Sequence, residues 1–223
     1  MGDPLLAGAE APVLTSEDGV RLVLARHGQT SSNVRHALDT VPPGPGLTEF
    51  GRRQAEDMAE HLAQEDIVAV RSSKALRAWE TAAPVARRHA LEIEVVDGIQ
   101  EIYVGDLEGT SDEASRQRFE EIYAGWHFGW LDRSMPGGEN GHQVLDRFFG
   151  AARDAARGVA SGVVVLVSHG AMLRLAASCL ASDVSSRRSN SAYLPNTGMI
   201  VLEASGAEPS GWRCVRWDGL DIE

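Results

Sequence analysis

The sequence predicts an α/β fold, a three-layer α/β/α sandwich built on a mostly parallel central sheet. Short apolar runs alternate with longer segments of helical periodicity along the 223 residues, a pattern typical of a parallel sheet covered on both faces. The connecting segments are short, and a composition of 43% hydrophobic and 24% charged residues is that of an ordinary globular protein. We therefore expect a single domain over residues 20–223, preceded by a loose tail over residues 1–19.

The expected strands are short apolar runs, and the expected helices carry apolar positions three or four residues apart. In chain order, strands are expected at residues 20–25, 67–70, 93–96, 163–167, 199–202 and 212–217. Helices are expected at residues 49–63, 75–89, 141–159 and 171–180. The proline- and glycine-rich segments between them, at residues 41–46 and 136–138, are expected to be loops and turns.

Two helix starts are marked by capping residues. Thr48 can cap the helix that follows it, and Glu49 suits the first turn because a carboxylate there interacts well with the helix dipole. Thr110 and Glu113 fit a capping box, which predicts a further helix running from this point towards Tyr123.

Charge and apolar pattern exclude several classes of protein. The formal net charge is −11 and no run of basic residues offsets it, so we expect no binding to nucleic acid or to anionic membranes. The longest apolar runs, such as residues 163–167, are short, whereas a bilayer-spanning helix needs roughly 20 residues. The first residues lack the pattern of a secretory signal, and two cysteines, Cys179 and Cys214, cannot build a disulfide framework. We expect a cytoplasmic protein.

The basic residues and the missing motifs narrow the chemistry further. Apart from Lys74, all of the 21 basic residues are arginines, so an anion site in this chain must be built from guanidinium groups and histidines. The sequence contains no His-Glu-x-x-His or Cys-x-x-Cys pattern and no phosphate loop that ends in Gly-Lys-Ser or Gly-Lys-Thr. We therefore expect neither a metal nor a cofactor.

Two of the predicted strands end in the same unusual way. The strand over residues 20–25 leads into Arg26-His27-Gly28, and the strand over residues 163–167 leads into Ser168-His169-Gly170. Ligands of such sheets bind beyond the carboxyl ends of the strands, glycine lets the backbone approach a ligand closely, and a helix N-terminus favours an anion. If the two strands are neighbours, both imidazoles face one crevice.

Five stretches of the chain carry a wider pattern, and both histidines belong to it. The stretches are Arg26-His27-Gly28-Gln29-Thr30-Ser31-Ser32-Asn33, residues 47–55, residues 72–82, residues 101–109, and Ser168-His169-Gly170 with Leu173-Arg174. In this order they resemble the signature segments of the histidine phosphatase superfamily, the phosphoglycerate mutase-like fold. The resemblance extends over nearly the whole chain, from Leu22 to Trp217. The first stretch alone is moderately specific, whereas all five in order are highly specific.

The resemblance implies a role for each matched residue. His27 is implied as the nucleophile that becomes phosphorylated, and Glu101 as the general acid that protonates the leaving oxygen. The groups implied to hold the phosphoryl oxygens are Arg26, Arg77, His169, Asn33 and the backbone amides near Gly170.

Physical chemistry makes these roles sensible. A phosphoryl group in transfer spreads charge over three oxygens, which fixed cations stabilise, and the forked donors of arginine match those oxygens. An imidazole attacks only through an unprotonated nitrogen, so the other nitrogen of His27 must donate to a fixed acceptor such as a backbone carbonyl. We expect His169 to be protonated as the charge partner of the phosphate. Glu101 must hold a proton near neutral pH, which requires burial or an anionic neighbour.

Two further carboxylates lie near these motifs. Glu108 is an alternative to Glu101 as the general acid. Glu139 follows the Pro-Gly-Gly turn and is similar to part of a Gly-Glu-Ser element of the family, with Asn140 in place of serine. We place Glu139 among the substrate-binding residues at the rim of the site, and the alternative is that it caps the helix that follows.

Two other features have more than one interpretation. Arg174 is expected to be structural rather than catalytic. The aromatic cluster of residues 126–130 either forms a hydrophobic wall for the organic part of the substrate or packs in the core.

The superfamily contains hydrolases and mutases on one site, and the fold does not choose between them. Residues 31–35 lack the tryptophan that precedes the asparagine in the mutases, and residues 102–105 read Ile-Tyr-Val-Gly where the mutases have Arg-x-Tyr-Gly. The sequence therefore predicts a metal-independent phosphomonoester hydrolase that acts on a small phosphorylated substrate through a phosphohistidine intermediate. The alternatives are a cofactor-dependent phosphoglycerate mutase and a phosphate-binding module without turnover. The substrate and the oligomeric state are not readable from the sequence, which is compatible with a homodimer.

Overall fold

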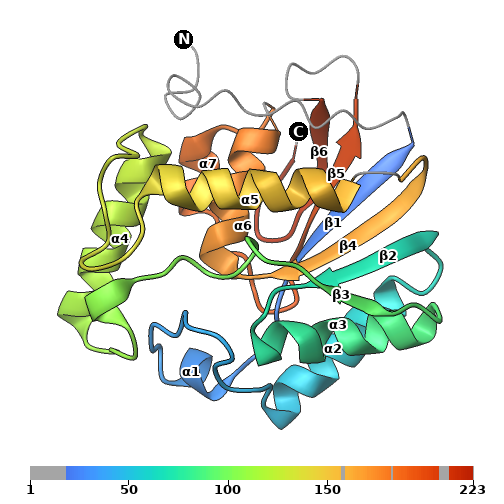
Figure 1. Ribbon diagram of the computed structural model, residues 1–223, viewed down its shortest axis with the longest axis horizontal. Helices are drawn as coiled ribbons and strands as arrows, with labels where there is room; N and C mark the ends of the chain where they lie inside the picture. The colour runs from blue at the N-terminus through green and yellow to red at the C-terminus, as the bar shows by residue number, and fades with distance from the viewer. Residues whose placement is uncertain (1–18, 157–158, 182, 206–210, 223) are drawn as a thin grey trace.

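The computed structural model describes residues 19–156, 159–181, 183–205 and 211–222, and these residues form the predicted sandwich (Figure 1). The predicted tail, apart from Gly19, lies outside the described residues. The described strands form one sheet in the order β3-β2-β4-β1-β5-β6. They are β1 (Val20–Arg26), β2 (Ile67–Ser72), β3 (Ile93–Val95), β4 (Gly162–Ser168), β5 (Met199–Ala204) and β6 (Trp212–Trp217).

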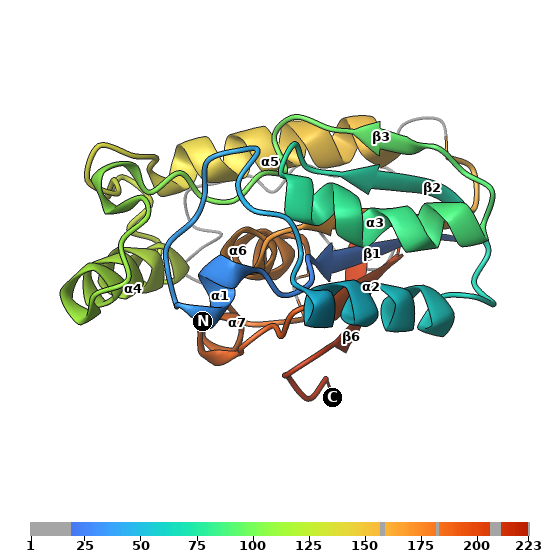
Figure 2. The same ribbon diagram turned by 90° about the horizontal axis from the view of Figure 1, so that it is seen from below.

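Helices lie on both faces of this sheet, as Figures 1 and 2 show from two directions. One face is covered by α2 (Glu49–His61) and α3 (Leu76–Arg88), the other by α5 (Gly141–Ala156) and α6 (Gly170–Leu180). The remaining described helices are α1 (Ser31–Val34), the 3-10 turn η2 (Gly105–Leu107), α4 (Glu113–His127) and α7 (Ser186–Ser191). Within the described ranges, no helix combines the length and apolar character that crossing a bilayer requires.

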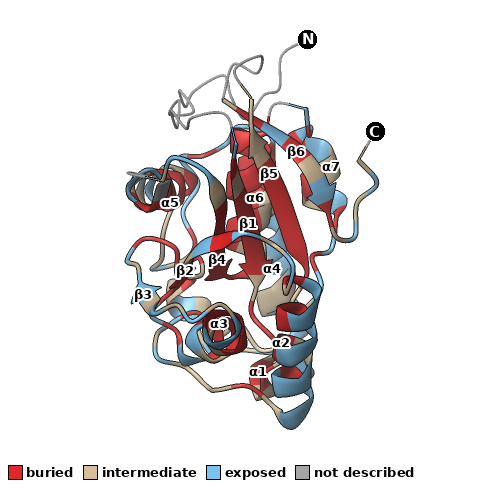
Figure 3. Cartoon of the chain, turned by 90° about the vertical axis from the view of Figure 1, so that its right-hand side faces the viewer, coloured by how far each residue is buried: buried red, intermediate tan, exposed pale blue. Residues whose placement is uncertain are grey.

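The alternation of side chains along β1 divides the core into two layers. Leu22 and Leu24 are fully buried on the face that packs against α5 and α6. Val23 and Ala25 point to the opposite face and pack against α2 and α3, as expected when successive side chains of a strand alternate. Figure 3 shows the strands as a buried layer between helices whose outer surfaces are exposed. Burial on both faces explains why the strand reads as a continuous apolar run.

The pairing of β1 with β4 places the two histidine-bearing strand ends side by side. The strands are parallel neighbours in which Arg26 lies opposite Ser168. The chain keeps this register one residue further, because the amide of His27 donates to the carbonyl of Ser168 at 3.0 Å. His27 and His169 therefore leave the sheet at the same edge.

The structure differs from the sequence-based expectation in several local details. β5 runs antiparallel to β1 and β6 antiparallel to β5, so the parallel part of the sheet is limited to the other strands. The helix predicted from Thr110 begins later, because Asp112 is its N-cap and accepts from the amide of Ser115 at 3.0 Å. Thr110 instead donates its hydroxyl to the carbonyl of Leu107. The helix predicted over residues 141–159 ends at Ala156, and α7 was not predicted.

Candidate active site

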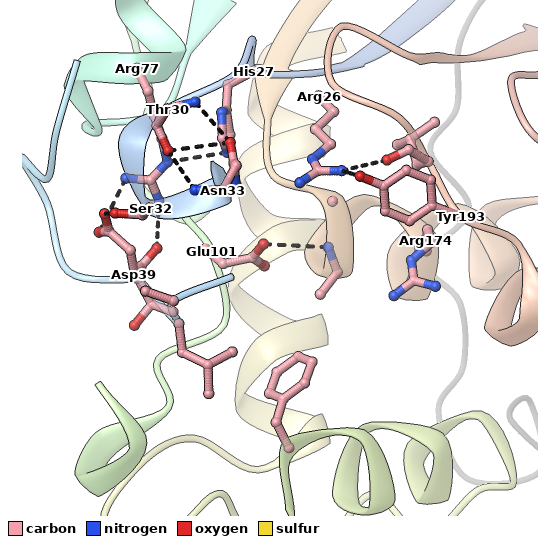
Figure 4. Close-up of a pocket in the computed structure, with 17 residues that line it drawn as sticks. Arg26, His27, Thr30, Ser32, Asn33, Asp39, Arg77, Glu101, Arg174 and Tyr193 are labelled. Carbon is pink, nitrogen blue, oxygen red and sulfur yellow. Dashed lines mark hydrogen bonds and ion pairs between the residues drawn. The ribbon is translucent and has the colours of Figure 1, made fainter. Parts of the chain in front are cut away.

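The two imidazoles lie together at the carboxyl ends of β1 and β4. Their ring centroids are 5.2 Å apart with an angle of 60° between the planes. Both side chains are buried, with 4% of His27 and none of His169 exposed. His27 borders a cavity that Arg26, Asn33, Arg77 and Glu101 also line (Figure 4). The structure thus brings together residues that are far apart along the chain.

The backbone fixes which nitrogen of His27 carries the proton. Nδ1 lies 2.7 Å from the carbonyl oxygen of Gly28, and because a carbonyl only accepts, Nδ1 must be the donor. Nε2 is then unprotonated, and it accepts a hydrogen bond from Nε of Arg77 at 3.2 Å. Burial, followed by the charges of Arg77 and Arg26, holds the pKa of His27 well below its usual value of 6.5. His27 is therefore a neutral imidazole with its lone pair directed towards arginine donors.

Arg77 connects the two histidines. Besides its bond to His27, it donates from Nη2 to the backbone oxygen of Asp39 at 2.9 Å and to Nδ1 of His169 at 3.2 Å. Nη1 lies 3.6 Å from a carboxylate oxygen of Asp39, which is too far for a hydrogen bond. Burial lowers the pKa of Arg77, and the carboxylates of Asp39, Glu101 and Glu108 oppose this effect. A guanidinium retains its proton in proteins, so Arg77 is a buried cation.

The protein groups around His169 favour its neutral form, whereas the sequence led us to expect a charged form opposite a bound phosphate. Its Nδ1 accepts from Arg77, so its Nε2 is the nitrogen that donates to the hydroxyl of Ser73, 2.7 Å away. Burial, then the positive charge of Arg77, lowers the pKa of His169 well below 6.5. The ligand-free site therefore favours a neutral His169. The charged imidazole expected opposite a bound phosphate stays a prediction, because the charge of the phosphate would offset burial and the repulsion from Arg77.

Arg26 supplies a second guanidinium on the other side of the cavity. Its Nη1 donates to the carbonyl of Leu194 at 2.6 Å and to the hydroxyl of Tyr193 at 3.1 Å, and these bonds hold its direction. Its Nε, like Nη1 of Arg77, is buried and has no hydrogen-bond partner among the described residues. Buried donors are nearly always paired in proteins, so two unpaired donors in the wall of one cavity indicate a site for an anion.

Glu101 lies at the N-terminus of α6. Its Oε1 accepts from the amides of Ile102 and Met172 at 3.0 Å each, and its Oε2 accepts from the amide of Ala171 at 3.3 Å. All three contacts are N–H donors, which suit the ionised carboxylate. The carboxyl group of Glu101 is therefore held in the cavity wall by backbone amides.

Asn33 lines the cavity and is held through its oxygen. Oδ1 accepts from the amide and the hydroxyl of Thr30, and from the side-chain amide of Asn196 at 3.2 Å. The same side-chain amide of Asn196 also donates to the carbonyl of His27 at 3.0 Å. The NH₂ group of Asn33 is thereby left as the donor for a ligand.

Glu139 is not at the rim where the sequence placed it. It does not line the cavity, because Arg147 binds both of its carboxylate oxygens at 2.7 and 2.9 Å and the amide of Tyr103 donates to it at 2.8 Å. Arg147 also donates to the carbonyls of Gly98, Gln100 and Glu101 at 2.7–3.0 Å. All five N–H groups of this guanidinium are thus used, and the Glu139–Arg147 pair fixes the backbone that carries Glu101.

Glu108 and the aromatic cluster also lie outside the cavity wall. Glu108 accepts from the amide and hydroxyl of Thr40 at 2.5–3.2 Å, so it anchors the loop that precedes α2. Trp126 is fully buried and donates to the carbonyl of Arg133, which is the core-packing interpretation. Phe128 and Trp130 are exposed at the surface. The apolar wall of the cavity comes instead from residues that include Leu38, Phe119 and Leu194.

Sequence reasoning missed several residues that hold the site. Ser73, Asp39, Asn196 and Tyr193 contact the two histidines, the two arginines or Asn33. Ser73 lies within one of the quoted stretches, immediately after β2, and its position at a strand end was a usable signal. The other three lie on loops, where nothing in the sequence marks them.

Gly170 leaves room for Arg26, which gives a test of the anion site. A Cβ atom at this position would lie 3.1 Å from Nε of Arg26. We expect Gly170→Ala to displace the guanidinium and weaken inhibition by inorganic phosphate about tenfold, less than the 10²–10³ typical of losing a donor outright. Gly150→Ala, at an α5 glycine with no atom within 4 Å of an added Cβ, is the matched control. Equal phosphate inhibition in the two variants would contradict the proposed position of the anion.

The two buried imidazoles also predict how stability depends on pH. Because the fold lowers the pKa of His27 and His169 below 6.5, the unfolded chain binds more protons below that value. Stability is then complete above about 6.5 and is lost as the pH falls towards the lower folded-state pKa values, by up to about 1.4 kcal/mol per pH unit for each histidine. Unfolding curves from neutral pH down to about 5 measure this loss. His27→Asn should make the free energy of unfolding depend less on pH in this range. His61→Asn, at an exposed position, should leave the dependence unchanged. The same pH dependence in both variants would refute the assignment of this loss to the buried histidines.

Comparison with known proteins identifies the family of the chain. Residues 22–218 match the family model of the histidine phosphatase superfamily (branch 1), and the chain belongs to this superfamily. The family and the fold predicted from the five stretches are thereby confirmed. Among solved structures, mycobacterial glucosyl-3-phosphoglycerate phosphatase Rv2419c superimposes with a TM-score of 0.74 at 23% identity, over 90% of this chain and 99% of that one.

The curated relatives match this chain over different fractions of their own length. The metal-independent phosphoserine phosphatase of Arabidopsis thaliana is 32% identical over 165 residues, which are 73% of this chain and 69% of that protein. The glucosyl-3-phosphoglycerate phosphatase of Mycobacterium tuberculosis is 27% identical over 91% of this chain and 93% of that protein. In other relatives, such as the PE-PGRS family protein PE_PGRS11 and the bifunctional protein Rv2228c of the same species, the matched region spans only 36% and 41% of the relative's length.

Proposed function

We propose that the protein is a metal-independent phosphomonoester hydrolase that works through a phosphohistidine intermediate on a small phosphorylated metabolite. The observation that carries the proposal is the neutral His27, whose unprotonated Nε2 accepts from Arg77 in a cavity that Arg26 also lines. The relatives named as phosphoserine and glucosyl-3-phosphoglycerate phosphatases support a small substrate. Both cysteines, Cys179 and Cys214, are buried thiols, which is compatible with the cytoplasm as the place of action.

The first step transfers the phosphoryl group to the enzyme. The lone pair on Nε2 of His27 forms the N–P bond while the ester P–O bond breaks and the leaving oxygen takes a proton from Glu101. As the phosphate enters, Nε of Arg77 turns from Nε2 to a phosphoryl oxygen, and Nε of Arg26 binds another. Backbone carbonyls hold another nitrogen of each guanidinium group, and in these positions the two cations stabilise the charge on the equatorial oxygens.

The second step returns the enzyme to its starting state. Water attacks phosphorus and gives its proton to the Glu101 carboxylate, while the electron pair of the N–P bond returns to Nε2 of His27. The hydrogen bond from Nδ1 to the carbonyl of Gly28 stabilises the positive charge that the ring gains when the N–P bond forms and loses when that bond breaks.

The test is the leaving-group dependence of the Glu101→Gln variant, measured with EDTA present. The wild type is expected to hydrolyse both p-nitrophenyl phosphate and an alkyl phosphate with chelator in the buffer. Since kcat/KM covers only the steps up to phosphoenzyme formation, Glu101→Gln should lower it by about 10²–10⁴ for the alkyl ester and far less for p-nitrophenyl phosphate, whose leaving group needs no proton. Equal losses would remove Glu101 as the acid, and a wild-type activity that requires added magnesium would overturn the mechanism.

A further inference from the structure

A third arginine lines the same cavity. Arg174 belongs to α6 and lies one helical turn beyond Ala171, so both residues face the cavity. In the view of Figure 4, Glu101 lies between the group formed by Arg77, His27 and Asn33 and the group that contains Tyr193 and Arg174. Arg174 was expected to be structural, and the steps of phosphoryl transfer described above make no use of its charge.

Neutral groups hold Arg174 in place. Its Nη1 donates to the carbonyl of Ala192 at 2.7 Å and to the carbonyl of Asn190 at 3.3 Å. Its guanidinium carbon lies 5.0 Å from the ring centre of Tyr123, whose hydroxyl is itself fixed by the carbonyl of Ala171 at 2.9 Å. These contacts use both protons of Nη1 and leave the edge formed by Nε and Nη2 for another partner.

No carboxylate balances this charge within the part of the chain that the structure describes. Arg77 has Asp39 and Arg147 has Glu139, whereas the ion pairs between described residues include none with Arg174. A fixed guanidinium without a carboxylate partner, in a cavity that also has an apolar wall, is suited to an anionic group on a ligand.

We infer that Arg174 binds a carboxylate of the substrate, so that the preferred substrates are phosphate monoesters of small hydroxy or amino acids. The inference rests on the proposed hydrolase function and adds a second point of attachment to it. The phosphate occupies the end of the cavity formed by His27, Arg26 and Arg77. The carboxylate meets the Nε–Nη2 edge of Arg174, which matches a planar carboxylate with two parallel hydrogen bonds.

Matched pairs of substrates test the inference. In the first pair, O-phosphoserine has a carboxylate that O-phosphoethanolamine lacks. In the second pair, 3-phosphoglycerate has a carboxylate where glycerol 3-phosphate has a hydroxymethyl group. The wild type is expected to prefer the carboxylated member of each pair in kcat/KM by about ten- to a hundredfold, the range for a hydrogen bond between charged groups. A wild type that hydrolyses both members equally well overturns the inference and leaves the proposed hydrolase intact, whereas no hydrolysis of any ester overturns both.

Variants of Arg174 separate binding of the carboxylate from support of the fold. Arg174→Gln is expected to lower kcat/KM for the carboxylated substrates at least about tenfold more than for their partners, mainly through KM. Arg174→Lys keeps the charge but loses the fork, so it should restore only part of the preference. Arg153→Gln removes an exposed arginine of α5 and should leave the preference at the wild-type ratio. An equal loss on both members of each pair in Arg174→Gln would show that the residue only supports the fold, and would overturn the inference.

Discussion

Replacing His27 with alanine is expected to abolish turnover. The imidazole supplies the lone pair that attacks phosphorus, and His27 is the one histidine among the described residues that line the cavity. Loss of a nucleophile lowers kcat by a factor on the order of 10⁴–10⁶. The measurement is steady-state hydrolysis of p-nitrophenyl phosphate by the purified variant, with EDTA present.

The matched control for His27→Ala is His61→Ala. His61 lies at the exposed end of α2, where its ring contacts the backbone oxygen of Asp57, and its loss should leave the rate within about a factor of two, as expected of a surface substitution. A His27→Ala variant that retains more than a small fraction of the wild-type rate would disprove the nucleophile assignment.

Arg77→Met is expected to have the second-largest effect. The guanidinium contacts both histidines, and Arg77 lines the cavity. An arginine that stabilises the transferring phosphoryl group is worth on the order of 10³–10⁵ in kcat. Arg77→Met should also weaken competitive inhibition by inorganic phosphate, because the guanidinium binds the phosphate ion as well as the phosphoryl group in the transition state.

Another buried arginine provides the control for this change. Arg71 lies on β2 with 9% of its surface exposed and pairs with Glu94 at 2.8 Å, outside the cavity. Arg71→Met also removes a mostly buried arginine from an ion pair. The activity of this variant therefore shows how much is lost through destabilisation of the fold alone. Comparable losses of activity in Arg71→Met and Arg77→Met would mean that destabilisation, and not the missing contact to the phosphoryl group, causes them.

The fold was largely predictable because its signals are local. The apolar run of β1 is buried on both faces, which is what a continuous run predicts, and Thr48 caps α2 by accepting from the amide of Gly51 at 3.0 Å. The reversed direction of β5 was not predictable, because the direction of a strand depends on how the chain returns to the sheet. The start of α4 was misassigned because Asp112 and Thr110 are both good capping residues and the fold uses the later one.

The candidate site was also predictable only in part. The proximity of His27 and His169 followed from two similar strand ends, since neighbouring parallel strands end at one edge. The partners that set their protonation are carried by other segments, namely Arg77 on α3 and Ser73 after β2. Their distances, and with them the neutral state of His169, arise only when the sheet is assembled. The position of Glu139 depends in the same way on a contact made on folding, because its partner Arg147 belongs to α5.

The central claim is that His27 carries the phosphoryl group, and trapping the intermediate tests it most directly. Glu101→Gln should form the phosphoenzyme readily from p-nitrophenyl phosphate and hydrolyse it slowly, because the base for the attacking water is missing. After an alkaline quench and proteolysis, mass spectrometry is expected to find the phosphoryl group on the peptide that contains His27, in a form that acid removes. A phosphoryl group on any other residue, or steady turnover with no phosphoenzyme at any time, would contradict the account.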